Sequence, residues 1–370
     1  MLKPITMFPT KPEEYAAHPV PSLDEWHQLW STWDLVTRQM IPDEQLLDKP
    51  IKLRNACVFY LGHIPTFFDM KLTEATAGSP TEPKYFYNIF ERGIDPDVDN
   101  PEQVHAHSEI PDTWPELHEI LTFQKRVRQR VKNIYASGQA YEDKWTGRAL
   151  WLGLEHEIMH LETLLYMLLQ SEWALPPPTA AKPDFAQIAA QAQANAVENE
   201  WFDVPEQEID IGLDDPDSSD GPVRHFGWDV EKPPRKVKVG AIKAKGRPIT
   251  NGEYARYMIA TGKKQTPASW TTLTAKNGTN GANGHVNGDS DVHDLVHDKA
   301  VRTMYGPVPL RYAMDWPVSA SYDELNACAQ YMGGRIPTLE EARSIYYYVD
   351  DLKNQGPSKA LGRTIPAVNR

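Results

Sequence analysis

The sequence predicts an α+β protein in which a helical bundle precedes a domain of helices and short strands. Apolar residues recur at helical spacing through the first 175 residues, whereas short strand-like runs between turns follow residue 200. Between them, residues 176–200 pass from a triple proline into Ala/Gln-rich sequence, as linkers often do. We therefore expect a bundle in residues 1–175, a linker in 176–200 and an α+β domain in 201–370.

The first domain is expected to contain four helices. The first begins after Ser22, a good N-cap, and the second carries residues 56–63. Pro65 predicts a kink or a new turn, which would place His63 at a helix end or bend. The third helix should span residues 116–135, and the fourth residues 149–169. Bundles of this kind hold metal sites between facing helices.

The second domain is expected to alternate short strands with helices. Strand patterns occupy residues 201–204, 209–212 and 236–239. Helical patterns return at residues 251–258 and 321–332. This mixture predicts an α+β domain rather than a second bundle.

Composition restricts the class of partner. The net charge of −13 provides no basic surface for nucleic acid or anionic lipid, and no apolar run reaches transmembrane length. Two widely separated cysteines, Cys57 and Cys328, suit a reducing compartment. We expect a cytoplasmic protein that acts on small molecules, without nucleic-acid or membrane partners.

His156 and His160 are the strongest candidates for metal ligands. Four residues apart on a helix, they diverge by only about 40° and share one face. The string His156-Glu157-x-x-His160 also fits zinc hydrolases, in which Glu157 would be the general base and Glu198 or Glu200 a further ligand. Packing of both histidines in the bundle is a third interpretation.

Glu162 lies about 200° around the helix from His160, too far to ligate the same ion. We interpret Glu162 as a carboxylate that packs beside a bound histidine or orients it.

Several motifs together resemble the iron(II)-dependent sulfoxide synthases of ergothioneine biosynthesis, in particular the fungal type. In the first domain the resemblance rests on GHIPTFFD at residues 62–69, FERGIDPDVD at 90–99 and HEIMHLE at 156–162, which look like a DinB-type bundle. In the second domain it rests on residues 226–233, 248–254 and 334–342, which resemble the formylglycine-generating enzymes, a C-type-lectin-like α+β fold.

The resemblance implies a reaction and a cofactor. In this family His63, His156 and His160 would bind iron(II) and leave open positions for a thiolate substrate and dioxygen. The enzymes join the thiol of cysteine or gamma-glutamylcysteine to C2 of the imidazole of trimethylhistidine and oxidise the sulfur. Neutral nitrogen ligands suit iron, so the chemistry agrees with the expected ligand set.

The chain departs from the family pattern at its end. After residues 335–338 the family continues through a region that supplies an active-site tyrosine and an acidic and arginine pair, and no residue up to Arg370 matches them. We therefore expect a C-terminally truncated second domain, with the catalytic tyrosine beyond the end of the chain. A non-catalytic remnant that acts as a binding partner is the alternative. No methyl-donor motif is present, so a methyltransferase activity would come from a partner.

Overall fold

The structure of the chain is a computed structural model that divides into two compact units. The helical unit comprises residues 11–180 and 214–232, and the α+β unit comprises residues 1–10, 181–213 and 233–370. The structure describes residues 18–51, 54–91, 94–96, 104–106, 111–178, 180–215, 227–273, 292 and 295–354. The presence of a helical unit followed by a strand-containing one confirms the predicted α+β class.

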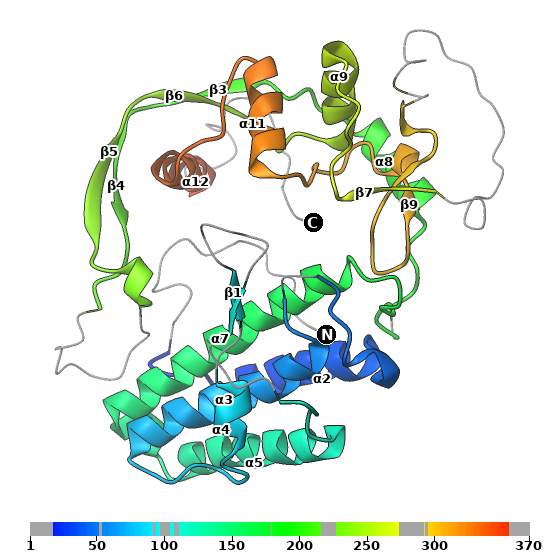
Figure 1. Cartoon of the computed structure of the whole chain (residues 1–370). Helices are drawn as coiled ribbons and strands as arrows, with labels where there is room; N and C mark the ends of the chain where they lie inside the picture. The colour runs from blue at the N-terminus through cyan, green and yellow to red at the C-terminus, as the bar shows by residue number, and fades with distance from the viewer. Residues whose placement is uncertain are drawn as a thin grey trace. The chain divides into compact units, whose positions relative to one another are not determined.

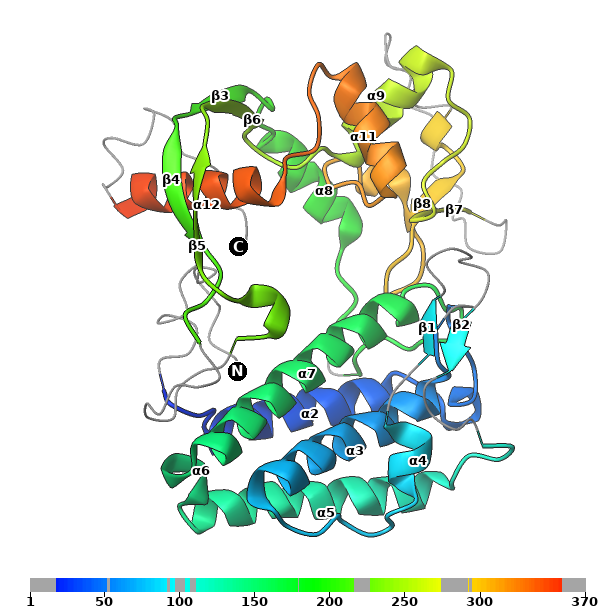
Figure 2. The same cartoon turned by 60° about the vertical axis from the view of Figure 1, so that its left-hand side comes forward.

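Helices α2, α3, α5 and α7 form the bundle of the helical unit. Both views show α3 beside α7 on one side and α5 on the other, and its packing contacts agree (Figure 1, Figure 2). The elements of this unit are α2 (Leu23–Gln39), α3 (Cys57–Thr76), α4 (Phe86–Phe90), β1 (Ile94–Pro96), β2 (Val104–Ala106), α5 (Leu117–Ala136), α6 (Gln139–Glu142) and α7 (Lys144–Leu168).

Local sequence explains where the bundle helices begin. The Ser22 side chain accepts from the backbone of Glu25, whose carboxylate accepts from the Ser22 backbone, and this capping box starts α2. At α7 the side chain of Asp143 accepts from the backbone N–H of Thr146. Such caps satisfy donors that a helix leaves free and stabilise it by about 1 kcal/mol each.

Of the two alternatives predicted at Pro65, a kink or a new turn, the new turn is wrong. Helix α3 continues through Pro65 to Thr76, so His63 lies in its first half rather than at its end. A proline removes one backbone donor, but residues 57–66 are buried on every side, and tertiary packing outweighs the local cost of about 3 kcal/mol.

Large aromatic side chains fill the bundle core. Trp26, Trp33, Phe86 and Phe123 are fully buried, and the ring of Trp26 stacks on Phe68 at a centroid distance of 4.9 Å. Each such side chain contributes about 1.5–3 kcal/mol on burial. The core therefore stabilises the packing of α3 against its neighbours.

Within its described residues, the α+β unit contains two two-stranded antiparallel ribbons and a three-stranded sheet. The ribbons pair β3 with β6 and β4 with β5, and the sheet has the order β7-β8-β9. Helix α12 packs across the β4–β5 hairpin, as Figure 2 shows. The elements are α8 (Phe185–Ala194), β3 (Trp201–Val204), β4 (Gln207–Ile211), β5 (Arg235–Val239), β6 (Ile242–Lys245), α9 (Asn251–Thr261), β7 (Trp270–Thr272), β8 (Lys299–Val301), β9 (Val308–Pro309), α11 (Tyr322–Tyr331) and α12 (Leu339–Asn354).

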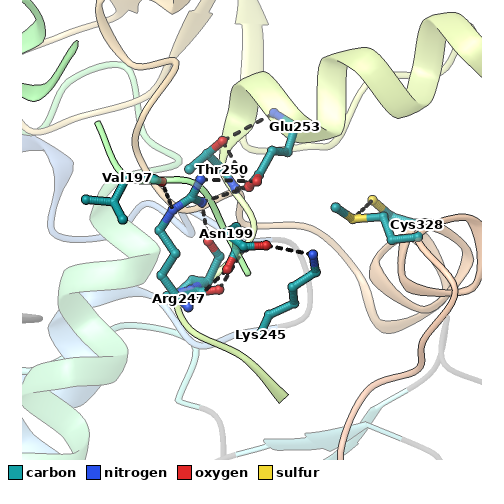
Figure 3. Close-up of polar contacts among 9 residues, drawn as sticks. Val197, Asn199, Lys245, Arg247, Thr250, Glu253 and Cys328 are labelled. Atoms are coloured by element: carbon teal, nitrogen blue, oxygen red, sulfur yellow. Dashed lines mark hydrogen bonds and ion pairs between the residues drawn. The ribbon is translucent and has the colours of Figure 1, made fainter. Parts of the chain in front are cut away.

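A polar cluster joins the end of β6 to the start of α9 (Figure 3). The buried Asn199 side chain donates to the carbonyl of Arg247 at 3.1 Å and accepts from its N–H at 3.2 Å. Arg247 in turn donates to both carboxylate oxygens of Glu253, which also accepts from the backbone N–H of Thr250 and so caps α9. These bonds attach the segment before β3 to the core of the α+β unit.

Residues 176–200, predicted as a linker, include α8. None of the helices in the described ranges is both long and apolar enough to cross a bilayer.

Candidate metal centre

Three histidine side chains converge between α3 and α7. His63 comes from α3, and His156 and His160 come from adjacent turns of α7. One ring nitrogen of each lies within 4.8 Å of the other two, and the Nε2 atoms of His156 and His160 are 3.1 Å apart. Nitrogen ligands about 2.1 Å from one ion, at angles between about 90° and 110°, would be separated by roughly 3.0–3.4 Å. The group therefore fits a metal ion.

A backbone carbonyl fixes the orientation of His63. Nδ1 of His63 lies 2.7 Å from the carbonyl oxygen of Phe90, the last residue of α4. A carbonyl can only accept, so Nδ1 carries the hydrogen and Nε2 keeps its lone pair. Metal-bound histidines are typically oriented in this way through their second nitrogen.

Burial keeps the three imidazoles neutral. It lowers the pKa of His63 to about 4, in spite of the bond to Phe90. Burial and then the neighbouring His63 lower the pKa of His160 to about 3, and burial lowers that of His156 as well. Near neutral pH the nitrogen lone pairs are thus available, because no proton has to be displaced before a metal binds.

Aromatic rings from α3 surround the histidines. The ring of Phe59 stacks on His63 at 5.0 Å between centroids, and the ring of Phe67 stacks on His156 at 3.9 Å. Sequence analysis did not single out either phenylalanine. Their positions four residues before and after His63 carried the signal, since residues four apart share a helix face.

Glu157, the base expected of a zinc hydrolase, lies elsewhere. Its side chain is 3% exposed and lines a small cavity with Trp30, Pro65, Phe68 and Arg128, among others. Burial raises the pKa of Glu157 to about 7, and Arg128, whose two terminal nitrogens bind Asp34, lowers it only in part. The carboxyl group therefore belongs to the packed interior of the bundle.

The remaining carboxylates of the sequence analysis are Glu162, Glu198 and Glu200, and the role expected of Glu162 stays a prediction. Glu162 is exposed on α7. Nδ1 of His160 is buried and has no hydrogen-bond partner among the described residues. Glu198 is exposed and Glu200 half-buried, and both belong to the α+β unit. Among the residues that the structure describes, the His, Cys, Asp or Glu side chains able to share an ion with these rings are the histidines alone.

Residues 214–215 and 227–232, in the connection from β4 to β5, belong to the helical unit. Buried Asp215 accepts from Nη1 of Arg148 at 2.6 Å. Nε1 of Trp228 donates to Glu155 at 2.6 Å, one residue before His156. Both contacts hold the helix that carries two of the three histidines.

Part of two motifs lies outside the described residues. This applies to residues 92–93 and 97–99 of the motif at 90–99, and to Phe226 of the motif at 226–233.

Comparison with known proteins finds relatives of the chain. Residues 24–164 match the DinB superfamily. The chain is 56% identical to ergothioneine biosynthesis protein 1 of Neurospora crassa over 367 residues, which cover 97% of the chain and 42% of that protein. It is 32% identical to ergothioneine biosynthesis protein 1 of Schizosaccharomyces pombe over 353 residues, 89% of the chain and again 42% of the relative.

The chain thus spans about two-fifths of the length of the relatives that it matches. The match to them extends well past the DinB region and through the α+β unit. Over nearly its whole length the chain is thus similar to these ergothioneine biosynthesis proteins, and residues 24–164 of its helical unit are DinB-like.

Proposed function

We propose that His63, His156 and His160 bind iron(II) and that the chain takes part in ergothioneine biosynthesis. The reaction would be the O2-dependent joining of the thiol of cysteine, or of gamma-glutamylcysteine, to the imidazole of trimethylhistidine, with oxidation of the sulfur. The observation that carries the proposal is the convergence of three imidazoles, two buried and one half-buried, whose ligand atoms all lie within 4.8 Å of one another. The names of the two relatives support the pathway.

The chain's own residues would perform three tasks. The imidazoles would hold the ion from one side, because all three come from the facing surfaces of α3 and α7. The carbonyl of Phe90 would keep His63 in the tautomer that presents Nε2. The rings of Phe59 and Phe67 would exclude water from the protein side of the centre. Iron(II) held there would supply the redox chemistry with dioxygen.

Metal analysis of protein purified without oxygen tests the centre. We expect about one iron per chain, and we expect His63→Ala to lose it. His27→Ala is the matched control, because His27 is exposed on α2. Equal iron retention by both variants would contradict the three-histidine centre.

An activity assay tests the reaction. Trimethylhistidine, either thiol and dioxygen are supplied to the iron-loaded chain, and a sulfoxide product is sought by mass spectrometry. The same assay on the His63→Ala variant controls for free iron. Iron binding without product in any of these mixtures would contradict the reaction assigned to this chain and leave the metal assignment intact.

A further inference from the structure

A buried carboxylate lies on the same helix as His63, away from the metal ligands. Asp69 on α3 is 0% exposed. Its Oδ2 accepts from the backbone N–H of Thr81 and the hydroxyl of Tyr87, both at 2.8 Å, and its Oδ1 accepts from the hydroxyl of Thr81 at 2.6 Å. The carboxylate thus attaches the segment after α3, and α4 itself, back to α3.

Arg130 of α5 compensates the charge of Asp69. Its Nη1 lies 2.7 Å from Oδ1 of Asp69 and also donates to the hydroxyl of Thr73 at 2.8 Å. Nη2 donates to the hydroxyl of Thr76 at 3.1 Å. A buried ion pair with its remaining hydrogen-bonding groups satisfied is geometrically well defined, and breaking it leaves an uncompensated charge.

The anchored element carries the carbonyl that orients His63. Helix α4 has only five residues, and Phe90 is the last of them, so its carbonyl has no partner within the helix. That oxygen instead accepts from Nδ1 of His63 at 2.7 Å. Tyr87, which contacts Asp69, lies three residues before Phe90, less than one turn along α4.

We propose that Asp69 and Tyr87 are positioning residues of the metal centre, acting through α4 and the Phe90 carbonyl on the tautomer of His63. The buried rings of Phe86 and Phe90 also hold α4, but apolar contacts tolerate sliding and rotation, whereas hydrogen bonds are directional. A displacement of about 1 Å would break the bond between Phe90 and Nδ1. His63 could then hold its hydrogen on Nε2 and block its own lone pair.

The inference rests on the proposed metal centre, but not on the reaction proposed for it. Its first readout is the tautomer of His63, measured in metal-free protein by the 15N chemical shifts of the two ring nitrogens. The His63 signals are assigned by their loss in His63→Ala. Because no metal takes part, this measurement can fail or succeed independently of the metal assignment. The second readout is the affinity for Co²⁺ in an anaerobic titration.

Tyr87→Phe removes the hydroxyl that binds Asp69 and keeps the ring. The matched control is Tyr85→Phe, which removes a hydroxyl from a 49% exposed tyrosine two residues earlier. We expect the wild type and Tyr85→Phe to show His63 with hydrogen on Nδ1. In Tyr87→Phe we expect a mixture of tautomers and Co²⁺ binding weakened about tenfold, the lower end of the effect of second-sphere changes.

Asp69→Asn keeps the shape of the side chain and removes the charge opposite Arg130. We expect a larger shift of the tautomer than in Tyr87→Phe. If Asp69→Asn does not fold, the His63 tautomer and the Co²⁺ affinity of Tyr87→Phe test the proposal. A Tyr87→Phe protein that melts at a lower temperature but keeps the wild-type tautomer and Co²⁺ affinity would overturn the proposal and leave the network a purely structural one.

Discussion

Asp215→Asn should loosen residues 227–232 from the helical unit without unfolding the bundle. The Asp215 side chain is 2% exposed. It accepts from Arg148 at 2.6 Å and from the backbone N–H of Gly227 at 2.8 Å, and the Lys232 ammonium lies 3.7 Å away. Asparagine keeps the shape but loses the charge, so the half-buried guanidinium of Arg148 loses an opposite charge 2.6 Å away.

The pKa of Asp215 gives the size of the stabilisation that its charge contributes. Burial alone would raise it, but the bonds from Arg148 and Gly227 and the charge of Lys232 lower it from 3.8 to about 2. At about 1.4 kcal/mol per pH unit, this difference is worth about 2 kcal/mol. Because the folded-state pKa is the lower one, the contribution is complete above pH 3.8 and is lost as the pH falls through about 2.

Hydrogen exchange of the Gly227 amide reports directly on this contact. A loss of about 2 kcal/mol corresponds to roughly 30-fold faster exchange at pH 7 in Asp215→Asn. At pH 3 about half of the difference should remain. Asp229→Asn is the control, since Asp229 is an exposed residue of the same segment. Exchange within twofold of the wild type at pH 7 would show that the ion pair does not hold the segment.

Three further outcomes follow from packing and ligation. Gly153→Ala should destabilise the helical unit by about 1–2 kcal/mol in urea unfolding, because the added β-carbon would lie 2.3 Å from the Phe68 ring. Gly240→Ala is the control and should not lower the stability, because no atom lies within 4 Å of its added β-carbon. Glu157→Gln should leave Co²⁺ affinity within twofold of the wild type, because Glu157 lines a different cavity; a tenfold loss would contradict that placement. Metal at 100 times its Kd should raise the free energy of unfolding by about 2.7 kcal/mol, and His63→Ala should abolish the increase.

Local patterns predicted elements of this chain but not their pairing. The apolar run at Trp201–Val204 predicted β3 at those same residues, and the N-cap at Ser22 predicted the start of α2. Strand β3, however, pairs with β6 rather than with its neighbour β4. That choice depends on contacts between distant segments, which residue periodicity does not contain. Pro65 shows that local sequence is insufficient in the same way, because burial of the surrounding helix outweighed the helix-breaking tendency of proline.

The candidate site was predictable only in part, because it also depends on contacts between segments that are distant in the sequence. The spacing of His156 and His160 indicated a shared helix face, but His63 was identified by resemblance, since nothing local relates α3 to α7. The Phe90 carbonyl was not predictable, because every residue has one and only the fold decides which carbonyl is free. The expectation that Glu162 packs beside a bound histidine or orients it stays a prediction, whereas the partner of His63 Nδ1 is a backbone carbonyl.

The charge of the proposed metal centre predicts which added small molecule the bound ion favours. Three neutral imidazoles do not offset a divalent ion, and buried uncompensated charge is costly. An anionic sulfur at an open position would reduce this cost, whereas a neutral hydroxyl would not. Cysteine should therefore tighten Co²⁺ binding about tenfold or more in an anaerobic titration at pH 7.5, and serine should leave it unchanged. Two ligands change each other's affinity by the same factor, so Co²⁺ should tighten cysteine binding as much as cysteine tightens Co²⁺ binding. Equal effects of cysteine and serine, after correction for binding of Co²⁺ by free cysteine, would show that the charge is offset by the protein itself.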